Sequence, residues 1–194
     1  MKINILGYAL IALVLIVATR IYRESTYFNL KCIVSDVDGK KYCVRERHKL
    51  ELAADRLAMV NGKMKKLVAH CGEKYPERDN VKRLVAGYDP KEIYETLPTS
   101  EYTAYSQNKG EKIAFCLDTE KKNGSLIDPN TLTFVAIHEL GHVASESIGH
   151  TDEFWKNFKF LLEEAESIGE LKEMAPSNIS YMLVTDETSH PPSG

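Results

Sequence analysis

The chain has 194 residues, of which 43% are hydrophobic and 27% are charged. This is the composition of an ordinary globular protein and excludes a chain that is disordered throughout, and the length leaves room for one membrane or targeting segment and one domain. The net charge of −3 is unevenly distributed, because residues 40–83 hold 13 basic and 6 acidic residues whereas residues 86–194 hold 8 basic and 19 acidic ones. The basic segment could touch an anionic surface, but its interleaved acidic residues favour solvated helix faces.

The four cysteines include no Cys-x-x-Cys pair, which argues against a zinc site built from cysteines. Cys32 and Cys43 flank a predicted hairpin turn and could form a disulfide, but a reduced intracellular state is equally compatible with the sequence. The disulfide state therefore stays open for these two residues and for Cys71 and Cys116.

The N-terminal segment Ile3–Thr19 is uncharged and mostly aliphatic, which is the short end of the length needed for a membrane-spanning helix. We expect residues 1–22 to form an uncleaved transmembrane anchor. A cleaved signal peptide is the alternative, but the single preceding lysine and the poor cleavage site at Thr19-Arg20 disfavour it. Because more basic residues follow the segment than precede it, we expect the C-terminal domain on the cytoplasmic side of the membrane.

Alternating apolar residues over 30–44, with Asp38-Gly39 at the centre, predict a β-hairpin. A long amphipathic helix is predicted over His48–Tyr75, where apolar residues recur every seven positions and Pro76 follows. Its repeating positions are Leu50, Leu57, Met64 and Cys71.

Residues 80–86 predict a short helix, and residues 89–97 predict an irregular helical piece between prolines. Two further strands, over 102–106 and 112–118, predict a second hairpin around Asn108–Gly110. The second of these strands is rich in apolar and β-favouring residues.

Asp128 and Pro129 predict the start of a helix, as N-cap and first helical residue. We expect Gly149 to end this helix and Thr151 to cap the next one, which Gly169 ends. We expect residues 30–175 to form one domain and residues 176–194 to form a tail that is disordered at its end.

His138-Glu139-Leu-Gly-His142 lies inside this predicted helix. Two histidines four residues apart lie about 400° round a helix, and so nearly on one face, where both imidazoles can reach one zinc ion. The intervening Glu139 can then act as a base on a zinc-activated water. Gly141 leaves space for another backbone or for substrate. Packed core histidines are the alternative, but their buried ring nitrogens would need partners.

A third metal ligand is expected at His150, because the chain turns there and can bring its side chain back towards the other two. An acid on the following helix is the alternative ligand, as in sites with two histidines and one glutamate. The candidate acids are Glu163, Glu164 and Glu166. Spacing does not choose among Tyr102, Tyr105 and Tyr181 as residues that could assist the reaction.

The pattern His-Glu-Leu-Gly-His, seven residues, His150 and then Phe154-Trp155 resembles the WLM/SprT-like zincin metallopeptidase family. The stretches Tyr102–Leu117 and Phe134–Val143 carry a closer resemblance to membrane-anchored WLM-like metallopeptidases of large DNA viruses. The resemblance implies that three histidines bind Zn²⁺ and that one glutamate is catalytic. These residues are His138, His142 and His150 for the metal and Glu139 for catalysis. The resemblance also implies that strand Lys112–Leu117 is the antiparallel edge strand that pairs with an extended peptide.

The expected fold is α+β: a zincin-like domain with an active-site helix, a small antiparallel sheet and a long amphipathic helix, preceded by a transmembrane helix. The expected function is a single-pass membrane metallopeptidase acting on protein or peptide substrates, on the cytoplasmic side or, if viral, at a virion or host membrane. One alternative is an inactive, zinc-stabilised binding or structural protein. Another is a DNA-stimulated SprT-like protease that relies on residues 40–83, although the sequence contains no recognisable nucleic-acid module. The oligomeric state is not specified by the sequence.

Overall fold

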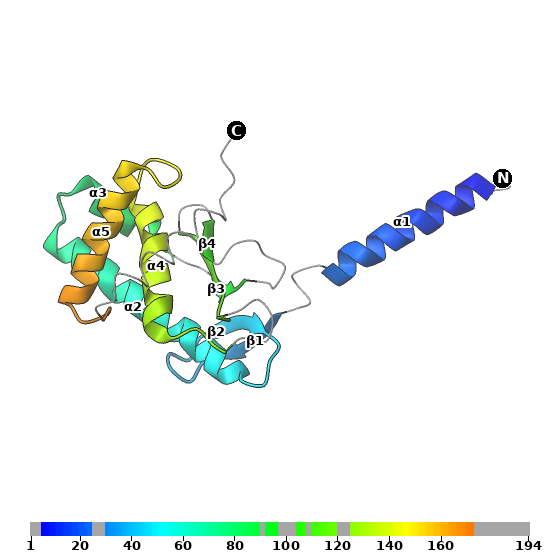
Figure 1. Ribbon diagram of the computed structural model, residues 1–194, viewed down its shortest axis with the longest axis horizontal. Helices are drawn as coiled ribbons and strands as arrows, with labels where there is room; N and C mark the ends of the chain where they lie inside the picture. The colour runs from blue at the N-terminus through cyan, green and yellow to red at the C-terminus, as the bar shows by residue number, and fades with distance from the viewer. Residues whose placement is uncertain are drawn as a thin grey trace.

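The computed structural model describes residues 5–24, 30–89, 92–96, 104–107, 110–119 and 125–172 (Figure 1). The described elements occur in short runs of helices and of strands and form an α+β fold. In order they are α1 (Ile5–Glu24), β1 (Leu30–Val34), β2 (Lys41–Arg45), α2 (Leu50–Lys74), α3 (Asp79–Gly87), β3 (Glu92–Glu95), β4 (Ala104–Gln107), β5 (Lys112–Phe115), α4 (Pro129–Ala144) and α5 (Asp152–Ser167). The predicted tail from residue 176 onward lies outside the described residues.

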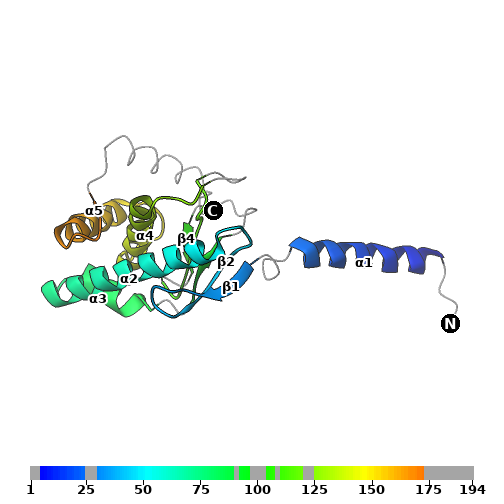
Figure 2. The same ribbon diagram turned by 90° about the horizontal axis from the view of Figure 1, so that it is seen from below.

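Helix α1 lies apart from the rest of the protein in both views (Figures 1 and 2), and its apolar side chains are largely exposed to solvent. Its uncharged part runs from Ile5 to Thr19 and is followed by Arg20. No helix within the described residues is long and apolar enough to cross a membrane. The prediction of a single-pass membrane protein anchored by residues 1–22 is therefore wrong.

The five described strands form one mixed sheet in the order β1-β2-β3-β5-β4. The predicted hairpins are confirmed, since β1 pairs antiparallel with β2 and β4 pairs antiparallel with β5. Their turns contain Gly39 and Gly110, whose φ angles of 68° and 108° are positive and favour glycine. At Gly110 a Cβ atom would lie 2.8 Å from the carbonyl oxygen of Gly87, so the turn also needs glycine for close packing.

The prediction of an antiparallel sheet is wrong in part. The sheet is mixed, because β3 pairs in parallel with both β2 and β5. The prediction of an irregular helical piece over residues 89–97 is wrong at this strand. The buried carboxylate of Glu95 accepts hydrogen bonds from the backbone N–H of Arg45 and from the Arg47 guanidinium. Burial raises the pKa of Glu95, and the hydrogen bonds and charges of the two arginines oppose that rise. The strand is thus fixed by partners about 50 residues away rather than by local sequence.

The edge of the sheet next to α4 is β4, not the predicted strand Lys112–Leu117. Strand β5 lies between β3 and β4, and its residues Ile113, Ala114 and Phe115 are fully buried. An internal strand covered on both faces is expected to be continuously apolar, which explains why β5 is the more apolar strand of the hairpin.

The Cys32–Cys43 disulfide joins β1 to β2, where the two residues are direct partners across the strands. Of the other two cysteines, Cys71 is buried and free, and Cys116 is half-buried and free. Burial raises the pKa of the Cys71 thiol to about 11, so this residue behaves as a small apolar side chain of the core.

The core lies between the sheet and helices α2 and α4, with α5 on the far side of α4 from β4 (Figures 1 and 2). The predicted amphipathic helix is confirmed as α2, and its predicted repeat is buried at Leu57, Met64 and Cys71. The short predicted helix is confirmed as α3. Helix α4 is therefore packed on several sides, which gives its side chains well-defined positions.

Helix α4 begins as predicted, because the Asp128 carboxylate accepts hydrogen bonds from the backbone N–H groups of Asn130 and Thr131. It ends at Ala144, five residues before the predicted stop at Gly149. The next residue, Ser145, is extended, and its buried hydroxyl donates to the Gly141 carbonyl. Gly149 lies instead in the loop that follows, with φ of 82°.

Helix α5 has the predicted boundaries: the Thr151 hydroxyl accepts a hydrogen bond from the Phe154 N–H, and Gly169 follows the helix with a positive φ of 73°. Glu164 ties α5 to α2, because its carboxylate accepts hydrogen bonds from three side chains of α2 and its C-cap. The donors are His70, Lys74 and Tyr75, at 2.8, 2.9 and 2.7 Å. Burial alone would raise the pKa of Glu164, but these hydrogen bonds lower it from 4.5 to about 2.

Replacing Glu164 with glutamine should lower the free energy of unfolding at neutral pH by on the order of 3 kcal/mol, since one pKa unit corresponds to 1.36 kcal/mol. The folded-state pKa is depressed, so this stability is present above the unfolded pKa and is lost as the pH falls from about 4.5 towards about 2. Urea unfolding of the metal-free proteins at a series of pH values would measure it. Glu163→Gln, at an exposed neighbouring position, is the matched control. A gap between wild type and Glu164→Gln that stayed constant from pH 7 to pH 2.5 would contradict this account.

Candidate metal centre

Three imidazoles converge at the C-terminal half of α4. The Nε2 atom of His138 lies 3.2 Å from Nε2 of His142 and 3.0 Å from Nε2 of His150. One ring nitrogen from each of the three residues lies within 4.8 Å of the others, and these residues could hold a metal ion. His138 is almost fully buried, whereas His142 and His150 are half-buried, so the group opens towards solvent on one side.

The separations match a zinc site. Zinc binds imidazole nitrogen at about 2.0–2.1 Å in a tetrahedron, and two ligand nitrogens on such a tetrahedron are about 3.3 Å apart. The two measured Nε2–Nε2 distances of 3.0 and 3.2 Å are close to that value. A ring nitrogen of a neutral imidazole either donates or accepts one hydrogen bond, whereas Nε2 of His138 lies close to two other ring nitrogens. This set of nitrogen atoms therefore fits a metal ion better than simple packing of side chains.

The loop from Ser145 to Thr151 brings His150 back over α4. Its positive-φ residue, Gly149, reverses the chain directly before His150. The sequence predicted a turn at this position, but it predicted that the helix would continue up to Gly149. In the structure Ile148 is 85% exposed at the tip of the loop, since the helix has already ended.

Aromatic rings of α5 form the wall behind the histidines. The centroid of the fully buried Phe154 ring lies 4.8 Å from His138, 4.3 Å from His142 and 4.8 Å from His150. Trp155 stacks on His150 at 5.6 Å with an interplanar angle of 29°. The sequence resemblance included Phe154-Trp155 in its motif but did not indicate that Phe154 would contact all three imidazoles. Their spacing of four and five residues from His150 was the available signal.

Gly141 permits this arrangement. A Cβ atom there would lie 3.0 Å from Cε2 of Phe154 and 3.4 Å from Cβ of Phe158. The sequence led us to expect space here for another backbone or for substrate, but the atoms that come closest belong to side chains of α5. The side chain that fills the space is Phe154.

Glu139 follows His138 on α4 and is only 5% exposed. Its carboxyl group therefore belongs to the same buried helix as two of the three imidazoles. A carboxylate beside an open metal position is the arrangement that general-base chemistry on a water molecule requires.

The structure does not bring the alternative acidic ligands to this group. The Glu164 carboxylate is hydrogen-bonded to α2 side chains, and Glu163 and Glu166 are exposed on α5. Among the candidate tyrosines, Tyr105 forms a hydrogen bond of 2.9 Å with the Tyr94 hydroxyl. As the next residue along β4, it lies on the opposite face of the sheet from the buried Ala104. Tyr102 and Tyr181 lie outside the described residues.

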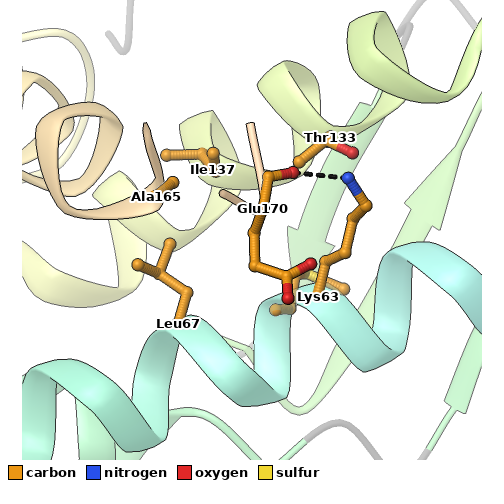
Figure 3. Close-up of a pocket in the computed structure, with 7 residues that line it drawn as sticks. Lys63, Leu67, Thr133, Ile137, Ala165 and Glu170 are labelled. Carbon is orange, nitrogen blue, oxygen red and sulfur yellow. Dashed lines mark hydrogen bonds between the residues drawn. The ribbon is translucent and has the colours of Figure 1, made fainter. Parts of the chain in front are cut away.

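A small crevice lies on another side of α4, between α2 and the end of α5 (Figure 3). Its α4 residues Thr133 and Ile137 are about 140° round the helix from the histidines, at 100° per residue. The Lys63 ammonium donates to the Glu170 carbonyl across it (Figure 3). The crevice is thus separate from the histidine group and is partly closed by that hydrogen bond.

Most basic side chains of residues 40–83 have partners within the described structure. Arg45 and Arg47 pair with Glu95 and Asp118, and Arg83 pairs with Glu153. Further partners are found for Arg56, Lys63, Lys66, Lys74, Arg78 and Lys82. The surplus of positive charge in this segment therefore serves largely to join elements of the fold.

Solved structures with a similar fold include Wss1 from Saccharomyces cerevisiae. Its crystal structure matches with a TM-score of 0.51 and 15% sequence identity, covering 66% of this chain and 88% of that chain. A crystal structure of a Wss1 mutant from the same organism matches with a TM-score of 0.51 and 14% identity, over 66% and 89% of the two chains. At these identities the likeness shows the fold alone, which is a Wss1-like α+β fold.

No protein-family model matches the chain, but viral proteins are similar in sequence. Uncharacterized protein 136R of Invertebrate iridescent virus 6 is 39% identical over 80 residues, covering 40% of this chain and 44% of that protein. Uncharacterized protein R325 of Acanthamoeba polyphaga mimivirus is 30% identical over 159 residues, covering 80% of this chain and 78% of R325. With this identity over most of both proteins, the chain belongs to the same family as R325 of mimivirus.

Proposed function

We propose that this protein is a zinc-dependent metallopeptidase that hydrolyses peptide bonds in protein substrates. The observation that carries the proposal is the convergence of three imidazole Nε2 atoms, with separations of 3.0 and 3.2 Å, on the helix that also bears Glu139. Three protein ligands with a fourth position left for water or substrate are typical of catalytic zinc sites, whereas structural sites use four protein ligands. The Wss1-like fold and the sequence resemblance to WLM/SprT-like zincins support the same class of enzyme.

The residues that would bind zinc are His138, His142 and His150. A bound zinc ion supplies a Lewis acid and lowers the pKa of a water molecule towards ~7. Glu139 would accept the proton of this water as its oxygen attacks the scissile carbonyl, and would then deliver the proton to the leaving amine. In this reaction one C–O bond forms and the C–N bond of the peptide breaks.

The aromatic wall would orient the imidazoles. Phe154 and Phe158 lie against His138 at centroid distances of 4.8 and 5.2 Å, so the ring cannot rotate freely. Mutation of neighbours that fix the orientation of ligand side chains typically lowers metal affinity by about 10- to 100-fold. The apolar rings also keep bulk water from the buried side of the group.

The substrate would lie along β4. Within the described residues this strand pairs with β5 on one side and forms the edge of the sheet on the other. An extended peptide can add to such an edge through main-chain hydrogen bonds. Strand β4 also contacts α4, so a peptide paired with it would pass beside the helix that carries His138.

An inactive protein in which zinc only stabilises the fold is the alternative. It explains the three histidines but gives Glu139 no role, whereas a peptidase would use this carboxylate as its general base. A DNA-stimulated protease remains a further prediction from the sequence, and the extensive pairing of the basic side chains in residues 40–83 gives it no specific support.

Replacing Glu139 with glutamine should abolish peptide cleavage while zinc remains bound, because the amide cannot accept the proton of the attacking water. Loss of a general base costs about 10²- to 10⁴-fold in rate. The full-length protein and the variant would be compared by metal analysis and by cleavage of an unfolded protein, with a chelator-treated wild type as control. Wild type that bound zinc but cleaved nothing across a broad peptide library would favour the inactive alternative.

Replacing His150 with alanine should lower zinc affinity strongly, whereas Glu163→Ala should leave it unchanged. The physical reason is that removing one of three ligands leaves two imidazoles, while Glu163 is exposed on α5 away from the group. Zinc competition with a chromogenic chelator would measure both variants side by side. Equal affinity of His150→Ala and wild type would show that the third ligand lies elsewhere.

A further inference from the structure

The loop that carries His150 is held by one carboxylate, that of Glu153 in the first turn of α5. Its Oε1 atom accepts a hydrogen bond from the backbone N–H of Glu146 at 3.0 Å. Its Oε2 atom accepts hydrogen bonds from the backbone N–H and the hydroxyl of Ser147, at 3.0 and 2.8 Å. Three donors from two consecutive loop residues thus point at one side chain, in the manner of a cap on a helix end.

Arg83 of α3 completes this arrangement from the other side. Its Nη2 atom donates to Glu153 Oε1 at 2.9 Å, and its Nε atom donates to the carbonyl oxygen of Ala144, the last residue of α4, at 2.9 Å. The same guanidinium therefore fixes both the end of α4 and the carboxylate that holds the loop. Helix α3 contributes no residue to the histidine group, but through these two contacts it is connected to the loop that carries His150.

The remaining part of the loop has little freedom. The Ser147 hydroxyl lies 2.6 Å from the Thr151 hydroxyl, which in turn accepts the N–H of Phe154 as the cap of α5. His150 lies between these two fixed points, and its Nε2 atom is 3.0 Å from Nε2 of His138. The position of the imidazole thus depends on Ser147, and through it on Glu153.

We infer that Glu153 is a positioning residue that holds the α4–α5 loop so that His150 completes the metal centre, with Arg83 orienting the carboxylate. This inference rests on the proposed function only in taking His150 as a metal ligand. Glu153 itself makes no contact with the ring nitrogens and is not a ligand. Its effect is to preorganise the third imidazole, so that metal binding does not have to order the loop.

The ionised form of the carboxylate is the one that suits this role. The hydrogen bonds from Glu146 and Ser147 lower the pKa of Glu153 from 4.5 to about 2. At neutral pH the carboxylate is therefore ionised, and it can accept hydrogen bonds but not donate them. Glutamine has the same shape, but its NH₂ group would face an N–H or hydroxyl donor of the loop. Glu153→Gln should therefore release the loop with little change in volume.

Metal binding tests the inference without any cleavage assay. The dissociation constant for Zn²⁺, measured by chelator competition on the full chain, should rise about 10-fold or more in Glu153→Gln, as for other groups that orient a ligand. The absorption spectrum of bound Co²⁺ should change in the same variant, because the third imidazole is displaced. Asp152→Asn is the matched control: it removes the same charge one residue earlier, from an exposed side chain, and should change the constant less than about fivefold, the size of an exposed charge effect.

Trp155 provides a readout in the metal-free protein. It is the only tryptophan of the chain and stacks on His150 at 5.6 Å. If the loop is released, the His150 ring leaves this face of the indole, so Glu153→Gln should show a red-shifted emission and stronger acrylamide quenching than wild type and Asp152→Asn. A change in fold alone is separated from this effect by the far-ultraviolet circular dichroism of each variant.

Two outcomes would overturn the inference. The first is that Glu153→Gln binds Zn²⁺ as tightly as wild type and shows unchanged Trp155 emission. The second is that Asp152→Asn loses as much affinity as Glu153→Gln, which would indicate a general charge effect. If Glu153→Gln does not fold, Ser147→Ala removes one of the three hydrogen bonds and carries the same test, with several-fold weaker binding expected and unchanged binding contradicting the inference. Failure of the proposed function is distinguishable, since it would be seen as wild type that binds metal and cleaves nothing.

Discussion

The close approach of α4 and α5 at Gly141 is the constraint on which the candidate centre depends. With no side chain at this position, the Phe154 ring lies against the backbone of α4 and contacts all three imidazoles. A Cβ atom there would be 3.0 Å from that ring, and α5 would have to move outward. Because the loop between the two helices is short, any such movement would also displace His150. The spacing of two helices thus sets the geometry of three ligands.

The rest of the fold supports this pair of helices from outside. Glu164 joins α5 to α2, and Arg83 joins α3 to the end of α4 and to α5. The sheet packs against α4 through β4, whose residue Ala104 is buried in the same core. Charged side chains that first suggest a binding surface are used as cross-links between elements. The polar contacts therefore specify how the apolar elements are arranged, while burial of apolar surface supplies most of the stability.

Local rules predicted much of the centre from the sequence. The Asp128 cap and the spacing of His138 and His142 depend only on helix geometry, and both are found as expected. The predictions that are wrong concern features that depend on distant partners. Strand β3 is held by contacts of Glu95 to residues about 50 positions away. Which strand forms the edge of the sheet depends on the strands that pair with β5. The early end of α4 depends on Asn157 of α5, which donates to the Ser145 hydroxyl. The membrane prediction is wrong because no helix of the described residues is long and apolar enough to cross a bilayer.

The Cys32–Cys43 disulfide has a consequence for the response of the protein to its redox surroundings. It closes a loop of only 11 residues, and the chain-entropy model assigns such a short loop about 3 kcal/mol of stabilisation. The bond joins β1 to β2, at the side of the sheet opposite β4, and the buried residues Tyr42 and Val44 anchor β2 independently of it. Reduction would therefore loosen the outer hairpin first and leave the histidines in place. We therefore expect the geometry of the histidine group to be the same in reducing and in oxidising conditions.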